Sequence, residues 1–269
     1  MLDKERYSGY KQVTEEELAK HFEGNFEGLL INQYIYTNTE DKIYVFNGTR
    51  IEEIYLPKQP KMSKKDVFQP RNFEQKMAFH LMSNDKVPIK TLIGVAGAGK
   101  TKLGLNFGLQ ALESGRVKKL FIVRQPSPVG EEIGFLKGTK EEKLAAWFNP
   151  IFDNMDDTWS IQDKIINKQI EFEAPAFMQG RDLQETFVLV DEAQLLTPEQ
   201  VKMLGSRIGE GSTIVFAGDY DQVFNKKYAG DRNGLLKMVD TLSGIEEFGV
   251  VHMTQSVRGR VAEIFATKM

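Results

Sequence analysis

The sequence predicts an α/β fold in which helices flank a mostly parallel central sheet, with a small β-rich module in front of it. From about residue 67 onward, predicted strands and helices alternate along the chain. The predicted strands are short, continuous apolar runs, such as 186–190 and 213–217, which is typical of strands buried on both faces of a sheet. A glycine-rich segment, residues 94–101, lies between a predicted strand and a predicted helix.

The elements of the larger part follow from apolar runs and from helix start signals. The strands are expected at 88–93, 117–123, 170–174, 186–190, 213–217 and 249–254. Helices are expected at 73–83 and at 101–114, where Gly115 is a natural stop. Capping-box patterns at 139–142 and 197–200 predict two more helix starts, the second with proline at its first helical position.

Residues 1–66 form the smaller part, and residues 67–269 the larger one. Three apolar runs at 29–36, 42–46 and 50–56, the last two separated by the turn signal Asn47-Gly48, predict a β-meander. Residues 57–65 are rich in proline and lysine and predict a linker. We expect the meander to cover an edge of the main sheet.

Composition limits the classes of protein that the chain can belong to. Its 269 residues are 41% hydrophobic and 27% charged, which is ordinary for a soluble globular protein. Zero cysteines exclude disulfides, thiolate metal sites and cysteine nucleophiles. Neither a secretory signal nor an apolar run long enough to span a membrane is found in the sequence, so we expect a cytoplasmic protein without membrane contact. A net charge of −3 argues against an obligate, charge-driven nucleic-acid binder, but allows a local basic channel.

The glycine-rich segment matches the phosphate-binding pattern G-x-x-x-x-G-K-[ST] at every fixed position. Glycines let successive backbone N–H groups turn toward a phosphate, and the following helix adds its positive N-terminal end. Lys100 is expected to reach the β- and γ-phosphates, and Thr101 to offer its hydroxyl to Mg²⁺. The alternative, a glycine-rich turn with an incidental lysine, fits the strand–loop–helix context less well. The predicted nucleotide-binding residues of this segment are Gly94, Val95, Ala96, Gly97, Ala98, Gly99, Lys100, Thr101 and Lys102.

Two acids, Asp191 and Glu192, directly follow the apolar strand 186–190. Acids at the carboxyl end of a central strand lie where α/β sheets hold their ligands. Asp191 is expected to bind Mg²⁺, and Glu192 to act as the general base on an attacking water. Acids also end strands and cap helices for structural reasons, but the phosphate loop earlier in the same α/β run favours the functional interpretation.

Two glutamines are candidates for contact with the nucleotide. Gln222 follows strand 213–217, where its amide could contact the γ-phosphate or the attacking water, although a turn rich in Gly and Asp explains the segment too. Gln75 could pair with the adenine edge, because an amide both donates and accepts. Asn72 three residues earlier also predicts a helix cap at this place, and both interpretations of Gln75 stay open.

Phosphoryl transfer needs positive charge at the developing transition state, which directs attention to arginines. The candidates are Arg124, Arg181, Arg207 and Arg258, although each such arginine is more often a solvated or salt-bridged surface residue. Arg258 lies just after the last predicted strand, a place suited to closing over a nucleotide of its own or of a neighbouring subunit.

Taken together, these segments resemble the PhoH-like ATPase family over roughly residues 67–260. The matching segments are 68–75, 94–101, 123–138, 174–183, 191–194, 207–209 and 218–222. The ordered set is more specific than the phosphate loop alone, and the segments 124–138 and 191–194 carry most of that specificity.

The resemblance implies a RecA-like P-loop ATPase core, related to superfamily 1 helicases, that uses ATP and Mg²⁺. It implies that Gln75 reads adenine, that Lys100 and Thr101 contact phosphate and Mg²⁺, and that Gln222 senses phosphate. Asp191 and Glu192 become the metal-binding and water-activating acids. The resemblance also suggests a ring, with a hexamer favoured, in which an arginine completes a neighbour's site, and an association with RNA or single-stranded DNA.

The sequence departs from the family pattern in three places. Residues 1–66 are too short for the PIN-type nuclease that some members carry, so we expect no such domain. Arg258 is followed by Gly259 and Arg260 instead of the usual histidine–proline pair, and the chain stops soon afterwards. The unusual N-terminal module and the short tail favour a phage member of the family.

The leading hypothesis is therefore a Mg²⁺-dependent ATPase, helicase-related, that remodels RNA or single-stranded nucleic acid as an oligomer. The alternative is a nucleotide-gated assembly module in which hydrolysis is slow and incidental, which the acidic pI of about 5.8 favours slightly. A kinase of the phosphate-loop type is a weaker third hypothesis, because Glu192 and Gln222 suit an attacking water better than an acceptor hydroxyl.

Overall fold

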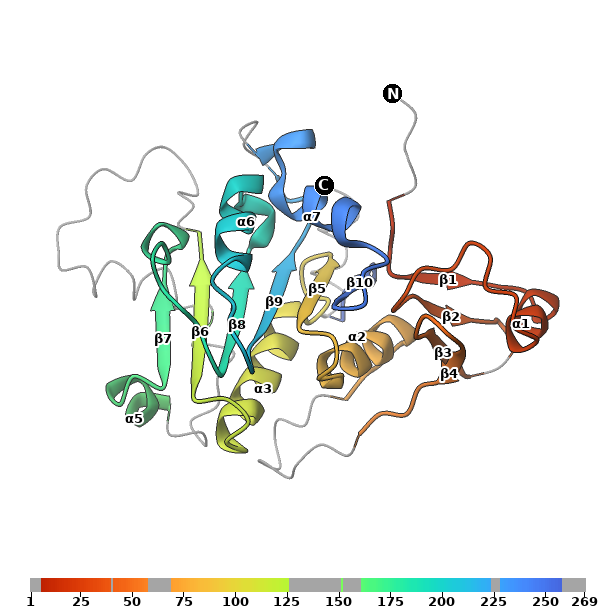
Figure 1. The fold of residues 1–269 in the computed structure, drawn as a ribbon, viewed down its shortest axis with the longest axis horizontal. Helices are drawn as coiled ribbons and strands as arrows, with labels where there is room; N and C mark the ends of the chain where they lie inside the picture. Colours follow the sequence, from red (N-terminus) through yellow and green to blue (C-terminus); the bar gives the residue numbers. More distant parts are fainter. Residues whose placement is uncertain are drawn as a thin grey trace.

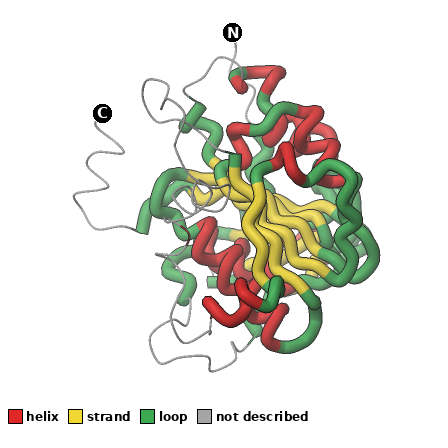
Figure 2. Tube along the Cα trace, turned by 90° about the vertical axis from the view of Figure 1, so that its left-hand side faces the viewer, coloured by secondary structure: helices red, strands yellow, loops and turns green. Residues whose placement is uncertain are grey.

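The computed structural model describes residues 6–39, 41–57, 69–125, 151, 161–223 and 228–257. It contains a six-stranded sheet and a separate four-stranded sheet formed by the N-terminal residues (Figure 1). The six-stranded sheet has helices on both sides, as the sequence predicts (Figure 2).

The six strands of the main sheet run in the order β10-β5-β9-β8-β6-β7, and every pairing between neighbours is parallel. Each strand lies within two residues of a strand expected from the sequence. They are β5 (Ile89–Gly94), β6 (Lys119–Arg124), β7 (Ile170–Glu173), β8 (Thr186–Asp191), β9 (Thr213–Gly218) and β10 (Phe248–Met253). Because all six point the same way, their carboxyl ends meet at one edge.

Alternating side chains of the strands enter two separate hydrophobic clusters, one on each face. Phe187 and Leu189 of β8 pack with helices α2 (Phe73–Ser83) and α3 (Lys100–Glu113). Val188 and Val190 pack on the other face, with helices α6 (Pro198–Gly205) and α7 (Gly234–Leu242). The remaining short elements are α5 (Ile161–Ile166), η2 (Pro175–Phe177), η3 (Ala193–Leu195) and η5 (Gly230–Arg232). Burial on both faces explains the continuous apolar runs of the strands.

Side chains fix the starts of the main helices. Thr197 and Gln200 form the predicted capping box of α6, with Pro198 at the first helical position. Asn72 accepts a hydrogen bond from the backbone N–H of Gln75 and caps α2, as the sequence pattern predicts. Asn233 caps α7, a helix that we did not predict. The capping pattern at 139–142 lies outside the described residues.

The N-terminal sheet contains the predicted antiparallel meander of β2 (Tyr34–Tyr36), β3 (Ile43–Phe46) and β4 (Ile51–Glu53). Helix α1 (Glu15–Phe22) and strand β1 (Tyr10–Gln12), which pairs with β2 in parallel, were not predicted. The expected strand over 29–36 is wrong in its first half, because Asn32 has a left-handed backbone (φ 64°) that turns the chain. Leu29 and Ile31 are apolar because they pack on the small core of this module.

This module lies against the edge strand β10 and helix α2, at the right of Figure 1. The backbone N–H of His252 donates to the carbonyl of Ser8 at 2.9 Å, along the open edge of β10. Asn32 donates through Nδ2 to the carbonyl of Phe248 at 2.9 Å, and Tyr10 donates through its hydroxyl to Glu74 at 2.9 Å. The N-terminal residues therefore cover the sheet edge that would otherwise be open to pairing.

A buried lysine stabilises the end of α2. Lys90 is 1% exposed, and its Nζ donates to the carbonyls of Leu81, Met82 and Asn84 at 2.7, 3.0 and 2.6 Å. These carbonyls lie at the C-terminal end of the helix, where backbone acceptors lack partners within the helix and positive charge is favourable. Burial lowers the pKa of Lys90 to about 7, from a usual value of 10.5.

We predict that Lys90→Met lowers the free energy of unfolding by about 1–3 kcal/mol, because buried carbonyls lose their donor. The unfolded chain holds the Lys90 proton up to its ordinary pKa of 10.5, while the folded protein releases it near pH 7. Between these two pH values, Lys90 therefore makes the free energy of unfolding increase with pH, and the variant lacks this dependence. Urea unfolding at several pH values measures both effects, with the exposed Lys86→Met as control. An unchanged pH slope in Lys90→Met would contradict the prediction.

Candidate functional site

The candidate site lies at the carboxyl edge of the main sheet, where four of its strands end side by side. The glycine-rich segment follows β5, and Arg124 is the last residue of β6. Asp191 ends β8 with Glu192 directly after it, and Asp219 follows β9. Ligands of open α/β sheets bind at such an edge, so the predicted phosphate loop and the predicted acids occupy one location.

The backbone of the phosphate loop requires glycine at its start. Gly94 has φ 150°, and a Cβ atom there would lie 2.0 Å from the carbonyl oxygen of Met253 on β10. Gly97 and Gly99 have φ values of 82° and 98°, which other residues rarely adopt. Gly99 is the N-cap of α3 and contributes no side chain to cap it. The N-terminal end of α3 is of the kind that can hold an anion such as phosphate.

The charge of Lys100 lies at this loop. Its Nζ donates to the carbonyls of Gly94 and Val95 at 2.5 and 3.0 Å. Burial raises the pKa values of Asp191 and Asp219, and the same ammonium group opposes this rise at both. Lys100 therefore brings positive charge to the loop and acts on both acids, as a phosphate-binding lysine would.

Thr101 and Asp191 form the pair expected to hold a metal ion. The Thr101 hydroxyl donates to Asp191 Oδ1 at 2.8 Å. A hydroxyl and a carboxylate in contact beside a phosphate loop are oxygen ligands of the kind that Mg²⁺ takes, so the residues fit this ion. Burial, and secondarily the charge of Glu192, raise the pKa of Asp191, while Arg124, Thr101 and Lys100 oppose the rise.

Arg124 contacts both acids within its own chain. Its Nη1 lies 3.3 Å from Asp191 Oδ2, and its Nη2 lies 3.4 Å from Glu192 Oε1. Arg124 and Asp191 are also paired residues of the neighbouring strands β6 and β8. The sequence indicated this arginine only as one candidate for positive charge at the transition state, and the double ion pair was not predicted.

The other candidate arginines lie elsewhere. Arg181 pairs with Glu171 and Glu173, at 3.1 and 2.9 Å, on the edge strand β7. Arg207 follows α6 and precedes Ile208, which is bridged to the chain just before β8, at the opposite edge from the phosphate loop. Arg258 lies outside the described residues.

Glu192 has a strained backbone and a buried partner. Its φ of 53° and ψ of 42° place a non-glycine residue in the left-handed region, a conformation that costs energy and that active sites often contain. Gln194 is 1% exposed and donates through Nε2 to Glu192 Oε2 at 2.7 Å. The Oε1 of Gln194 accepts from the backbone N–H of Asp219 at 3.1 Å. One amide thereby joins the end of β8 to the end of β9.

The Gln222 segment turns directly after β9. Asp219 is buried, and its Oδ1 accepts from the backbone N–H of Asp221 at 3.0 Å. Burial raises the pKa of Asp219. Gln222 donates through its backbone N–H to the carbonyl of Asp219 at 3.3 Å, so it belongs to the turn at the site edge. Its phosphate-sensing role stays a prediction.

Gln75 joins α2 to the phosphate loop. Its Nε2 donates to the carbonyl of Ala98 at 3.0 Å, and its Oε1 accepts from the backbone N–H of Arg71 at 2.8 Å. The Asn72 cap and the contact with the loop give this buried amide a structural role. Contact with adenine stays a prediction and would use the second hydrogen and the second lone pair of the amide.

The chain that leaves β10 is held beside the loop by Glu74. The carboxylate of Glu74 accepts from the backbone N–H and the hydroxyl of Thr254 at 2.8 and 2.7 Å. Further on, the backbone N–H of Val257 donates to the carbonyl of Gly97 at 3.1 Å. The residue before Arg258 therefore contacts the phosphate loop.

Sequence reasoning missed Gln194 and Glu74 as organisers of the site. Gln194 lies two residues after Glu192, and the strained turn between them could not be predicted from residue types. Glu74 looks like an ordinary acid in the first turn of a helix, which is a common place for one.

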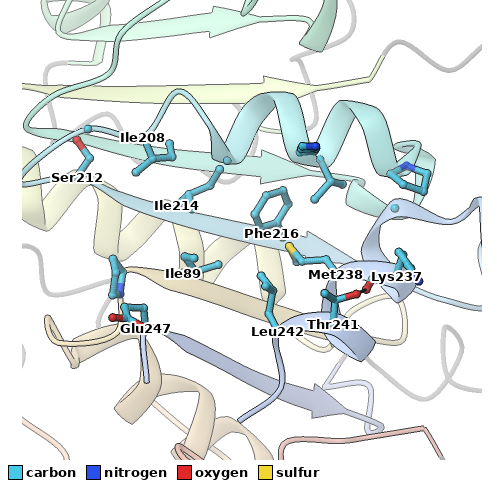
Figure 3. A pocket seen from close by; sticks show the side chains of 17 residues that line it. Ile89, Ile208, Ser212, Ile214, Phe216, Lys237, Met238, Thr241, Leu242 and Glu247 are labelled. Carbon is cyan, nitrogen blue, oxygen red and sulfur yellow. Dashed lines mark hydrogen bonds between the residues drawn. The ribbon is translucent and has the colours of Figure 1, made fainter. Parts of the chain in front are cut away.

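An apolar cavity of about 620 Å³ lies elsewhere, between α6 and α7 (Figure 3). Ile89, Ile214 and Phe216 of the sheet and Met238 and Leu242 of α7 line it. The residues predicted to contact nucleotide or metal are absent from its lining, so this cavity is separate from the site at the carboxyl edge.

The family model described as "PhoH-like protein" matches residues 67–267. The chain belongs to the PhoH-like family. Membership supports nucleotide binding and hydrolysis, in agreement with the loop and acids described above. Within the part of the chain that the structure describes, helices long and apolar enough to cross a membrane are not found.

Curated relatives match this PhoH-like chain over different lengths. "Protein PhoH2" of Bacillus subtilis is 40% identical over 205 residues, which is 73% of this chain and 46% of the relative. "Protein PhoH2" of Thermobispora bispora is 29% identical over 262 residues, 94% of this chain and 60% of the relative. The chain spans about half the length of such relatives. The second match extends well into residues 1–66, so that module does not distinguish a phage protein from a bacterial one.

Among solved structures, the chain is similar to domain III of the Thermotoga maritima replication initiation protein DnaA. The identity is 15%, the TM-score is 0.36, and the match covers 74% of this chain and 69% of that chain. The family assignment rests on the sequence matches and not on this likeness.

We predict that Gln194→Leu lowers the free energy of unfolding by about 1–3 kcal/mol, because the buried Asp219 N–H loses its acceptor. The amide hydrogen of Asp219 should also exchange faster with solvent. Urea unfolding and hydrogen exchange measure the two effects. Gln169→Leu, which changes an exposed glutamine, serves as control, and equal behaviour of the two variants would refute the role given to Gln194.

Proposed function

We propose that the protein is a Mg²⁺-dependent ATPase that couples hydrolysis to the remodelling of RNA or single-stranded DNA as a ring oligomer. The observation that carries the ATPase part is the position of Lys100, Thr101, Asp191 and Glu192 at one edge of the sheet. Thr101 and Asp191 are in direct contact, although they are far apart in the sequence. The nucleic-acid part and the ring rest on family resemblance.

Each residue would act on ATP through its own chemistry. The loop backbone and the N-terminal end of α3 would hold the phosphates, and Lys100 would neutralise charge on the β- and γ-phosphates. Glu192 would accept a proton from the attacking water, and Gln222 would orient that water or the γ-phosphate. Thr101 and Asp191 would hold Mg²⁺, which neutralises negative charge as the phosphoryl group is transferred.

Lys102 and Gln75 would complete the nucleotide contacts. Lys102 lies in the first turn of α3, close to the phosphates by its position in the sequence. Gln75 would contact adenine from the start of α2 while it keeps its hydrogen bond to the loop. Arg258 would act from the segment after Val257, in its own site or in that of a neighbouring subunit.

The second candidate is a nucleotide-gated assembly module with slow, incidental hydrolysis. The net charge of −3 favours it, because a protein dedicated to nucleic acid usually carries excess positive charge. This candidate requires the same ATP-binding residues but not a working Glu192.

We predict that Glu192→Gln lowers the rate of ATP hydrolysis by about 10²–10⁴-fold, because the general base is lost, while ATP binding remains. Steady-state hydrolysis and binding of a fluorescent ATP analogue measure the two properties. Glu199→Gln, which changes an exposed acid on α6, should leave both unchanged. The same assay with single-stranded RNA and single-stranded DNA tests the coupling. Hydrolysis that responds to neither, together with a biological role that survives Glu192→Gln, would favour the assembly module.

We further predict that the rate of hydrolysis per chain rises with protein concentration, because a neighbouring subunit supplies an arginine. Sedimentation measured over the same concentrations should show assembly in the same range. Arg258→Ala should lower hydrolysis without preventing assembly. Equal rates per chain for monomer and oligomer would overturn the shared site.

A further inference from the structure

The ion pairs of Arg124 involve the two carboxylates that the proposed function assigns to metal binding and water activation. The guanidinium spans them, with Nη1 on Asp191 and Nη2 on Glu192. The Arg124 side chain is 19% exposed and that of Asp191 is 6% exposed, so water screens this contact poorly. The direct attraction in such a pair is less screened than on the surface, although desolvation offsets much of it, and removal of one partner leaves charge buried.

Among the residues that the structure describes, the guanidinium is the positive group in ion-pair contact with both acids. Asp191 Oδ1 accepts from the neutral Thr101 hydroxyl, and Glu192 Oε2 accepts from the neutral Gln194 amide. Arg124 takes the other oxygen of each carboxylate. Lys100 acts on Asp191 through space, but its Nζ donates to loop carbonyls. Without Arg124, the two neighbouring acids would repel one another more strongly, because they would lose the cation that contacts them both.

A divalent cation bound by Asp191 would add two positive charges beside this guanidinium. Like charges at such separations repel strongly in a partly buried site. The Arg124 guanidinium and a divalent cation from solution would therefore compete for the Asp191 carboxylate.

We propose that Arg124 competes with the divalent cation for Asp191, and thereby sets how strongly the site takes metal without nucleotide. This rests on the proposed function in its assignment of Asp191 to the metal. Arg124 is a positioning residue here: it holds the two carboxylates in place. Mg²⁺ bound by Asp191 would weaken this contact, and an anionic phosphate would be a suitable alternative partner for the guanidinium.

The test uses Mg²⁺ alone, without nucleotide, so it does not depend on hydrolysis. Thermal unfolding and titration calorimetry are measured on the full chain, under the same buffer conditions for every variant. Wild type should bind Mg²⁺ weakly and gain little in melting temperature. Arg124→Ala should melt lower than wild type without Mg²⁺, regain stability when Mg²⁺ is added, and bind it about tenfold or more tightly, because the competing cation is gone.

Three further variants keep the result interpretable. Arg116→Ala removes an arginine that pairs with Asp85 away from the site and should behave as wild type toward Mg²⁺. Arg124→Lys keeps the charge but loses the contact with both acids, so its Mg²⁺ affinity should be intermediate. This variant also provides the test if Arg124→Ala fails to fold. Adding Asp191→Asn to Arg124→Ala should abolish the gained binding.

Equal Mg²⁺ affinity in wild type, Arg124→Lys and Arg124→Ala would overturn the proposal. So would a gain in affinity that persists in the Asp191→Asn double variant, because the metal would then bind elsewhere. If wild type hydrolyses no ATP but Arg124→Ala gains Asp191-dependent Mg²⁺ binding, the competition stands and the proposed function falls.

Discussion

The whole arrangement depends on one constraint: all described strands of the main sheet run parallel, so their carboxyl ends share one edge. Loops after β5, β6, β8 and β9 must then meet, although their sequences are far apart. The contacts between Thr101, Arg124 and Asp191 follow from this alignment. A change of strand order or direction would separate these residues without altering any of them.

The second organising principle is electrostatic. The site concentrates acids, Asp191, Glu192 and Asp219, in partly or fully buried positions, and burial raises the pKa values of both aspartates. The chain compensates with Arg124 and Lys100 and with the amide of Gln194. The Glu192 side chain is held by Arg124 on one oxygen and by Gln194 on the other, and its backbone has a left-handed conformation.

Much of the fold and part of the candidate site could be predicted from the sequence, because they depend on local patterns of residues. Continuous apolar runs located the six strands, and the loop pattern located Lys100 and Thr101. The double ion pair of Arg124 could not be predicted, because it depends on which strand neighbours β8 and in what register. The left-handed turn at Asn32 is also hidden in the sequence, since the apolar residues around it look like a strand. Strand order, register and such turns depend on tertiary packing and not on residue type alone.

The hydrogen bond from His252 to Ser8 has a practical consequence for anyone who handles the molecule in pieces. A fragment trimmed to begin at the linker would carry every residue proposed for ATP, yet it would expose the backbone of β10 along its outer edge. Bare edges of this kind pair with other chains. In the same fragment, Glu74, which lies close to the phosphate loop, would lose the hydrogen bond that it accepts from the Tyr10 hydroxyl. If such a fragment were insoluble, the cause would therefore be the exposed edge of β10. The result would not count against the residues proposed to bind and hydrolyse ATP.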